Sequence, residues 1–449
     1  MDLFLSIPGH GTMGLAMRVP LPEIAPPALS RLINGDLWSE WAEQGRVPAL
    51  DRVRPAVKYV RLKPDGNCRL AVFKEKSGAA GAPPVGHLVR LFADPERARV
   101  SFEKERERWA GMYEPFYCQE NRALVLPFPA DPELPALARL HEPRRFKRAL
   151  TTALPLSTTE EWRVRGRSLR RELLAYKPGR RAVYRVDASL RHRESGQDRA
   201  FVVHAKLAAG ETISRARTRL EAVCAARPES ADWSVPQPLE ASPGLLACAW
   251  VEGPSAGSLV RGADAAAARV LERAGSALAQ LHALRPRWGE STGPGDEASR
   301  LRRVTTDLAR ILPDAGDRIR ALGERVAGAI SALGAEGTSP VHGDFHLDQI
   351  LLSEHGVVLV DLDRAHVGRP AQDICRVLAH LFELRAPTGL RTAFLEGYGA
   401  VAELPSQAEA RASEASHLLR RASIPLRSMD PDWPAEIERR VERARALVA

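Results

Sequence analysis

The chain has 449 residues, enough for two or three compact units, because single hydrophobic cores stop growing near ~250–300 residues. Hydrophobic residues are 44% and charged residues 27%, ordinary for a globular protein, and no apolar run reaches the ~18 residues that span a bilayer. The net charge of +9 comes from arginine, with 57 arginines against 8 lysines spread along the chain, and no basic cluster, helix-turn-helix or zinc-finger pattern indicates nucleic-acid binding.

The N-terminus and the cysteines indicate a cytoplasmic protein without a membrane segment. The opening residues MDLFLSIPGHGTMG lack a basic start, and Pro8 and Gly9 interrupt their apolar stretch, so they make a poor signal peptide. The five cysteines are odd in number and never form a CxxC pair. They predict buried thiols rather than disulfides or zinc ligands.

The first half of the chain shows two hairpin patterns. Residues 1–50 form an extension with one amphipathic stretch near Leu29–Trp41. The run VKYVRLKPDGNCRLAVF (57–73) predicts two strands around a Pro–Gly turn, and LLAYKPGRRAVYRVDASL (173–190) predicts two more around Lys177–Arg180.

The match between these hairpins continues downstream. Each is followed by a polar loop, a strand and a charged helix, and Arg90 precedes Glu105 by the same fifteen residues that separate Lys206 from Glu221. A further strand follows in each case, at 123–128 and at 245–250. We therefore predict duplicated α/β modules over residues 51–150 and 151–260, with chance similarity of topology as the alternative.

The pattern becomes helical beyond Gly253. Residues 262–284 have helical spacing with an alanine-rich face, and 297–333 predict one or two further helices. Short apolar strands return around polar residues at 338–365, and the chain from Gln372 onward is mostly helical. A helical unit over 261–449 after strand-rich modules predicts two lobes with a cleft between them.

The stretch His342-Gly-Asp344-Phe-His-Leu-Asp-Gln349, followed after a hairpin by Asp361, carries the most informative chemistry. Phosphoryl transfer needs an acceptor hydroxyl held in line and a metal that gathers the phosphates. A carboxylate can take the hydroxyl proton, and magnesium prefers oxygen ligands such as carboxylates and amides. Asp344, Gln349 and Asp361 supply such a set. The alternative is that Asp344 only caps a helix.

The order HGDxxxxQ, apolar strand, DLD and GxxxxDI resembles the aminoglycoside phosphotransferase and choline kinase superfamily, which is related to protein kinases. The usual motif of that superfamily ends in Asn, and the form HGDxHxxQ is similar to that of maltokinase-type sugar kinases. The resemblance implies a two-lobed, protein-kinase-like α+β fold that uses ATP and Mg²⁺. It implies Asp344 as catalytic base, His342 as a brace of its loop, Gln349 and Asp361 as metal ligands, and Asp373 as a support from below.

The second module supplies the matching small lobe. A kinase small lobe needs a strand lysine for the phosphates and a helix glutamate that holds it, which predicts Lys206 and Glu221, with Glu211 as a weaker rival. The predicted cofactor-binding residues also include Gly179 and Arg180, in the turn that would cover the phosphates, and Trp250 and Val251, in the hinge that would face adenine.

Three nearby residues and the first module leave alternatives open. His346 could contact substrate, although a packed histidine is the plainer interpretation, and Asp348 and Asp363 are either extra metal ligands or solvated loop acids. The first module has Arg90 in place of the lysine, and arginine does not substitute for a phosphate-gripping lysine. We expect a degenerate copy without nucleotide that caps the small lobe, stiffens it or shapes one wall of the cleft.

The sequence thus predicts an ATP-dependent phosphotransferase with a duplicated, degenerate N-terminal small-lobe module and a helical C-lobe. Its partner is a small molecule with an acceptor hydroxyl, with no role for nucleic acid or membrane. A sugar, an amino alcohol or an aminoglycoside-like compound are the candidates, and a basic pocket would instead suit a phosphorylated or carboxylated acceptor. The alternative is a pseudokinase that binds nucleotide and regulates a partner, favoured only by Gln349. The short phosphate turn counts against a kinase that acts on protein side chains.

Overall fold

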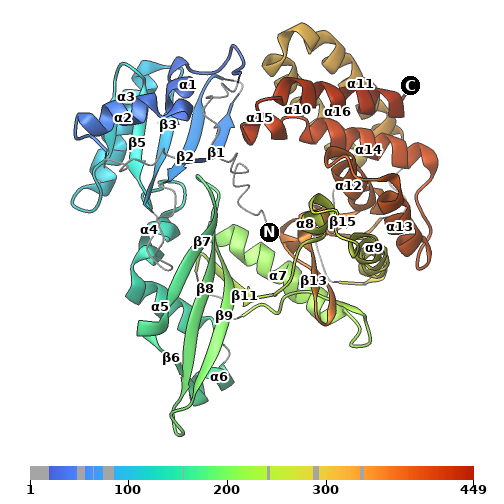
Figure 1. Ribbon diagram of the computed structural model, residues 1–449, viewed down its shortest axis with the longest axis horizontal. Coiled ribbons are helices and arrows are strands. Elements are labelled where there is room, and N and C mark those ends of the chain that lie inside the picture. The colour runs from blue at the N-terminus through green and yellow to red at the C-terminus, as the bar shows by residue number, and fades with distance from the viewer. Residues whose placement is uncertain are drawn as a thin grey trace.

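The computed structural model describes residues 20–47, 56–63, 65–73, 85–154, 156–239, 243–286, 293–333 and 338–449 (Figure 1). The interpretation of the opening residues 1–14 as a poor signal peptide lies outside the described residues. None of the helices in these described parts is both long and apolar enough to cross a bilayer. All five cysteines are free thiols, as predicted, and three of them are buried.

The first module is a five-stranded antiparallel sheet with helices on both faces. Its order is β1-β2-β3-β5-β4, and the strands are β1 (Ala56–Leu62), β2 (Cys68–Phe73), β3 (Gly86–Leu91), β4 (Phe116–Cys118) and β5 (Ala123–Pro127). The predicted amphipathic stretch becomes two helices, α1 (Pro27–Asn34) and α2 (Asp36–Glu43), because Gly35 between them adopts a positive φ of 85°. Trp38 and Trp41 of α2 pack against one face of the sheet, and α3 (Pro95–Trp109) packs against the other.

The second module repeats this connectivity. Its strands β7 (Arg170–Lys177), β8 (Arg181–His192), β9 (Asp198–Ala208) and β11 (Leu245–Ala249) pair in that order, and α7 (Gly210–Ala226) follows β9 as α3 follows β3. A short strand β6 (Trp162–Val164) adds to the far end of β8, after α6 (Leu156–Glu161) and before the 3-10 turn η1 (Gly166–Ser168). Both predicted hairpins are therefore present. Arg90 pairs with Leu124 as Lys206 pairs with Leu246, so the two residues hold equivalent positions.

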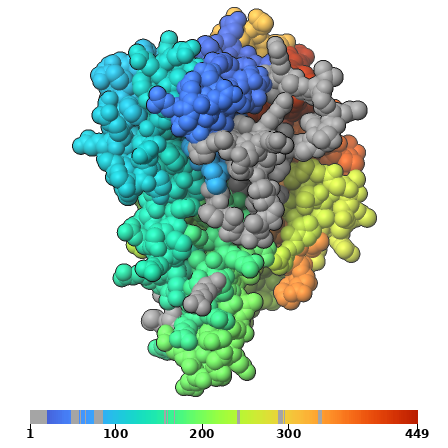
Figure 2. Space-filling view, turned by 60° about the vertical axis from the view of Figure 1, so that its left-hand side comes forward, coloured from blue at the N-terminus to red at the C-terminus, as the bar shows by residue number. Residues whose placement is uncertain are grey.

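The two modules share one hydrophobic core. Helices α4 (Pro135–His141) and α5 (Pro143–Thr152) join them, and α5 continues across residue 150. Phe73 of the first sheet packs edge-on against Tyr176 of the second, and Phe146 of α5 packs against Tyr184. Figure 2 shows the blue and cyan first module directly above the green second module. The division of the chain at residues 150 and 260 stays a prediction.

The remaining elements form a mostly helical part of the chain with two small sheets. A three-stranded sheet, β10-β14-β13, and a two-stranded sheet, β12-β15, lie at the side of this lobe that meets the second module. The strands are β10 (Trp233–Ser234), β12 (Ser339–Val341), β13 (Ile350–Ser353), β14 (Gly356–Leu359) and β15 (His366–Gly368). The helices are α8 (Ala256–Arg261), α9 (Ala267–Ala283), α10 (Pro294–Ile311), α11 (Gly316–Ala332), α12 (Pro370–Glu383), α13 (Thr388–Gly399), α14 (Gln407–Arg421), α15 (Ile424–Arg427) and α16 (Trp433–Leu447), with 3-10 turns η2 (Pro313–Ala315), η3 (Leu347–Gln349) and η4 (Leu362–Arg364).

The first module also reaches the helical lobe, so the chain closes around a cleft. Strand β1 contacts α15, Met429 is buried in the core of the first module, and Trp433 Nε1 donates a hydrogen bond of 2.6 Å to the Pro20 carbonyl (Figure 1). The cleft has a volume of about 850 Å³ and is lined by residues of all three parts, including Tyr59 and Lys206. Residues of the first module therefore line one side of this cleft, and the role of the module stays a prediction.

Candidate active site

The loop after β12 places Asp344 at the cleft. Gly343 has a positive φ of 76°, and a Cβ there would lie 2.2 Å from the Arg364 carbonyl oxygen, so the tight turn requires glycine. The backbone N–H groups of His342 and Gly343 donate to the two Asp373 carboxylate oxygens at 2.6 and 2.9 Å. His342 is buried, and its Nε2 contacts the Val360 carbonyl at 2.9 Å. Asp373 and the Val360 carbonyl thus hold the loop through hydrogen bonds.

Asp373 is held ionised at the base of this loop. Burial favours its neutral form, but hydrogen bonds from His282 and from the loop backbone outweigh burial and lower the pKa of its carboxyl. His282 bridges Asp373 at 3.2 Å and the Tyr398 hydroxyl at 2.9 Å, which ties α9 and α13 to the loop. Asp373 therefore supports the loop through hydrogen bonds to its backbone and to His282.

Asp361 lies at the end of β14 and meets the catalytic loop. It has a positive φ of 64°, which turns the chain sharply into η4. Gln349 Nε2 lies 3.4 Å from Asp361 Oδ2, and Asp361 and Asp344 both line the cleft. Asp344 and Asp361 therefore line the same cleft, and Gln349, which is buried, contacts Asp361.

Lys206 joins the second module to this loop. Its Nζ lies 2.5 Å from Asp361 Oδ1 and 2.8 Å from Asp363 Oδ2, and its side chain is 6% exposed. Burial favours the neutral amine, but the two carboxylates outweigh burial and raise the pKa of Lys206. Burial likewise opposes ionisation of Asp361, and the charges of Lys206 and Arg181 hold its pKa well below its usual range. Both partners are charged at neutral pH.

The predicted pairing of Lys206 with Glu221 is replaced by this arrangement in the described structure. Glu221 is 46% exposed and forms an ion pair of 2.6 Å with Arg217, one turn earlier on α7. The buried face of α7 carries Ile213, Ala216, Leu220 and Val223, and Glu221 lies beside that face. The rival Glu211 is more exposed still and pairs with Arg215 at 3.6 Å. The aspartates after β14 take the role predicted for a helix glutamate.

An apolar pocket adjoins Lys206. It is lined by the predicted hinge residues Trp250 and Val251 together with Val183, Leu246, Leu351 and Val360. The Arg185 guanidinium lies 4.7 Å from the centre of the Trp250 ring and holds it in place. Cys248 also lines this pocket, and burial raises the pKa of its thiol to about 12, so it is not a nucleophile.

The turn with Gly179 and Arg180 is clamped by a residue that the sequence did not single out. Gly179 has a φ of +71°, and its N–H donates to Asp131 Oδ2 at 2.6 Å. The same oxygen accepts a hydrogen bond from the Tyr176 hydroxyl at 2.8 Å. Asp131 lies in the loop after β5, the position equivalent to the predicted hinge after β11. No spacing pattern pointed to it, because the contact depends on how the modules pack.

Two arginines contact the predicted base. Arg376 of α12 forms an ion pair with Asp344 Oδ1, and Arg364 Nε lies 3.8 Å from Oδ2. Arg376 follows Asp373 by three residues, so helical spacing could have placed it on the same face of α12. Neither contact was predicted from the sequence.

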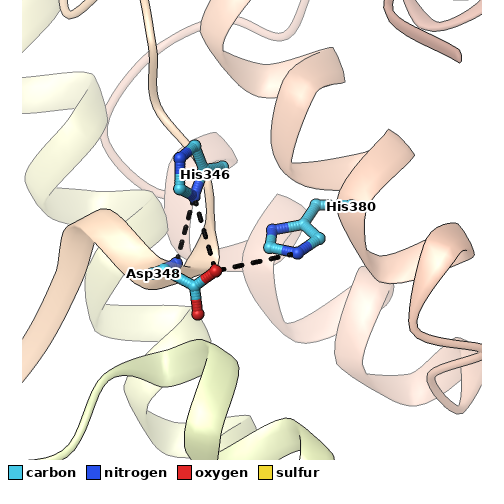
Figure 3. A group of neighbouring side chains, drawn as sticks. All are labelled: His346, Asp348 and His380. Atoms are coloured by element: carbon cyan, nitrogen blue, oxygen red, sulfur yellow. Dashed lines mark hydrogen bonds and ion pairs between the residues drawn. The ribbon is translucent and has the colours of Figure 1, made fainter. Parts of the chain in front are cut away.

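His346, Asp348 and His380 form a compact cluster at the wall of the cleft (Figure 3). Their potential ligand atoms lie within 4.8 Å of one another, a spacing that suits a metal ion. Nδ1 of each histidine, however, accepts a backbone N–H at 3.3 Å, and Arg261 holds Asp348 at 2.7 Å. Burial lowers the pKa of His380 to about 4 and that of His346 well below 6.5, so both rings are neutral. The cluster therefore braces the turn that carries Gln349.

Comparisons with known proteins agree with the family resemblance. The model of the phosphotransferase enzyme family matches residues 185–414. Similar solved structures include macrolide 2'-phosphotransferase MphH from Brachybacterium faecium, with 20% identity over 65% of this chain and 96% of that one, at a TM-score of 0.40. They also include choline kinase from Cryptosporidium parvum (8% identity, 68% and 94% coverage, TM-score 0.47) and a choline/ethanolamine kinase family protein from Mesorhizobium loti (15% identity, 67% and 94% coverage, TM-score 0.44). No curated protein matched the chain.

Replacing Lys206 by Met should lower the free energy of unfolding by about 3–5 kcal/mol, because two nearly buried carboxylates lose their cation. The double variant K206M/D361N should lose less than the sum of the single variants, as urea unfolding of all three can show. The difference between wild type and K206M should shrink as the pH falls through the lowered pKa of Asp361, since protonation ends the pairing. K104M, at an exposed lysine of α3, is the matched control. Equal destabilisation by K206M and K104M would contradict the pairing.

Proposed function

Because this chain belongs to the phosphotransferase enzyme family, we propose that it transfers the γ-phosphoryl group of ATP to a hydroxyl of a small molecule. The observation that carries the proposal is the convergence of Lys206, Asp361 and Asp344 on one cleft, with buried Gln349 in contact with Asp361. A phosphate-binding cation, metal-binding oxygens and a base are the groups that phosphoryl transfer requires.

The nucleotide fits between the apolar pocket and Lys206. Adenine would lie against Trp250 and Val251, and the phosphates would extend toward Lys206 and the Gly179 turn. Asp361 is ionised and nearly buried, and Gln349 supplies an amide oxygen once its side chain is turned, so both fit a magnesium ion. Bound Mg²⁺ would neutralise charge on the phosphates.

Asp344 is placed to act on the acceptor. It lines the 850 Å³ cleft with a side chain that is 20% exposed, so a hydroxyl compound can reach it. The acceptor oxygen forms a bond to the γ-phosphorus while the bond to the bridging oxygen of ADP breaks. The hydroxyl proton passes to the Asp344 carboxylate. The result is ADP and a phosphate ester of the acceptor.

The first module would position the phosphate turn. Asp131 clamps Gly179 and Tyr176, and Glu133 forms a bidentate ion pair with Arg69 close against the same glycine. A Cβ on Gly179 would lie 2.5 Å from Glu133 and 2.6 Å from Arg69. The nucleotide-free copy would thus stiffen the small lobe through its hinge-equivalent loop.

A pseudokinase is the second candidate, favoured by one observation. Lys206 and Asp344 are both neutralised by protein partners, which is also the state expected of an inactive cleft. Magnesium-dependent ATP consumption separates the two candidates, since a pseudokinase binds nucleotide without turnover.

Substituting Asp344 by Asn should reduce phosphoryl transfer by about 10²–10⁴-fold, the usual contribution of a general base. The affinity for ATP, measured by calorimetry, should stay near the wild-type value, because Asp344 lies on the acceptor side. D317N, at a fully exposed aspartate of α11, is the control for a generic loss of charge. Near-normal turnover in D344N would show that another group takes the proton.

Substituting Asp131 by Ala should raise the KM for ATP about tenfold, because the released turn no longer holds one conformation. The size of the effect follows from the lost hydrogen bonds, since hydrogen bonds to charged groups contribute ~1.5–3 kcal/mol. The KM for the acceptor should change little. The comparison variant is D94A, which removes the cap of α3 in the same module without touching the turn. A KM for ATP that is unchanged in D131A, or raised equally in D94A, would remove the positioning role.

A further inference from the structure

The cleft carries an excess of positive charge. Eleven lysine and arginine residues line it against six aspartates and glutamates. A cleft lined by one sign of charge concentrates ligands of the opposite sign. The nucleotide accounts for part of this charge, next to Lys206, but much of it lies on α12, α14 and α15, on the acceptor side.

The acids of the cleft are already engaged by nearby cations. Asp361 and Asp363 hold Lys206, and Asp348 holds Arg261 at 2.7 Å. Glu383 binds Arg421 in a bidentate pair with both distances at 2.7 Å. None of these four acids forms an ion pair with Arg376, Arg420 or Arg427 in the described structure.

Two partly buried arginines of the cleft, Arg376 next to Asp344 and Arg420 on α14, have incomplete charge compensation. Arg420 has its nearest carboxylate, Glu297, at 3.8 Å, beyond hydrogen-bonding distance. The Arg376 side chain is 12% exposed, its Nε is buried without a hydrogen-bond partner among the described residues, and its one ion pair is with Asp344. Burial, together with the positive charge of Arg376 and Arg364, lowers the pKa of Arg420 to about 10. Cations held this close together destabilise the folded protein when no anion lies between them.

Two further arginines repeat the pattern, one on the acceptor side and one in the phosphate turn. Arg427 of α15 and Arg180 of the phosphate turn both line the cleft, and neither forms an ion pair with a described carboxylate. Burial and the positive charge of Arg61 and Arg180 lower the pKa of Arg427. Cationic acceptors would meet repulsion from these arginines.

We propose that the acceptor is a hydroxyl compound that carries its own anionic group, a phosphate or a carboxylate, and that Arg376 and Arg420 bind this group. The inference rests on the proposed function, because it identifies the acceptor class of the same cleft. Arginine suits the task, since its planar fork matches both anions. An anion that engages Arg376 would also compete with the ion pair to Asp344 and leave that carboxylate for the hydroxyl. The product would then bear two anionic groups.

The site can be tested by binding before any acceptor is known. Protein saturated with Mg²⁺ and AMP-PNP, so that nucleotide-site cations are occupied, is titrated with inorganic phosphate and separately with acetate in a calorimeter. We expect saturable binding of at least one anion, weakened about 10- to 100-fold in R420Q, because a hydrogen bond to a charged group contributes on that scale. R411Q, on the exposed face of the same helix α14 and outside the cleft lining, should bind as wild type does. Absence of binding, or equal loss in R411Q, would overturn the proposal.

A transfer assay with matched acceptors separates this inference from the kinase assignment. Glucose is compared with glucose 6-phosphate, glycerol with glycerol 3-phosphate, and glyceramide with glycerate, with aminoglycosides and choline as cationic members. The anionic member of a pair should have the higher kcat/KM, and R420Q should reduce that preference at least tenfold. Transfer to neutral or cationic acceptors with no preference for anions would contradict the proposed anionic acceptor. It would still support the proposed kinase activity. Anion binding without magnesium-dependent ATP turnover would support the proposed anion site. It would contradict the proposed kinase activity.

Discussion

The ion pair of Lys206 with Asp361 and Asp363 is the interaction on which the arrangement of the cleft depends. It joins β9 of the second module to the turn after β14, two segments 155 residues apart in the chain. Charges this deeply buried are stable only when each finds its partner. The pair therefore fixes the distance between the apolar pocket and the loop that carries Asp344. It also keeps the amine and carboxylate ionised, the forms that bind phosphate and a divalent cation.

Around this pair the chain builds a cleft with three walls. The second module supplies the apolar pocket, the helical lobe supplies Asp344 and the arginines of α12 and α14, and the first module closes the remaining side. The first module has the connectivity of the second, but an arginine stands where the second has Lys206. Its loop after β5 contributes Asp131 to the neighbouring turn. The first module, with Arg90 at the position of Lys206, thus contributes a supporting contact to the turn of the second module.

Much of the fold and part of the site could be predicted from the sequence, because their signals are local. The hairpins follow from alternating strands around Pro–Gly turns, and the loop around Asp344 and Asp361 follows from a spaced motif. The partner of Lys206 was assigned wrongly because sequence distance fixes a residue's helix but not the face it presents. Asp131 depends on how two modules pack, for which one sequence holds no spacing rule. The crowding of Arg376 and Arg420 arises from two helices that meet only in the folded chain.

The most direct test is a structure of the protein with Mg²⁺ and AMP-PNP. In that structure the phosphates should lie within hydrogen-bonding distance of Lys206 Nζ, the metal should bind Asp361 and Gln349, and adenine should lie beside Trp250. Nucleotide phosphates bound against Arg90 in the first module, or a metal held away from Asp361, would contradict the proposed site.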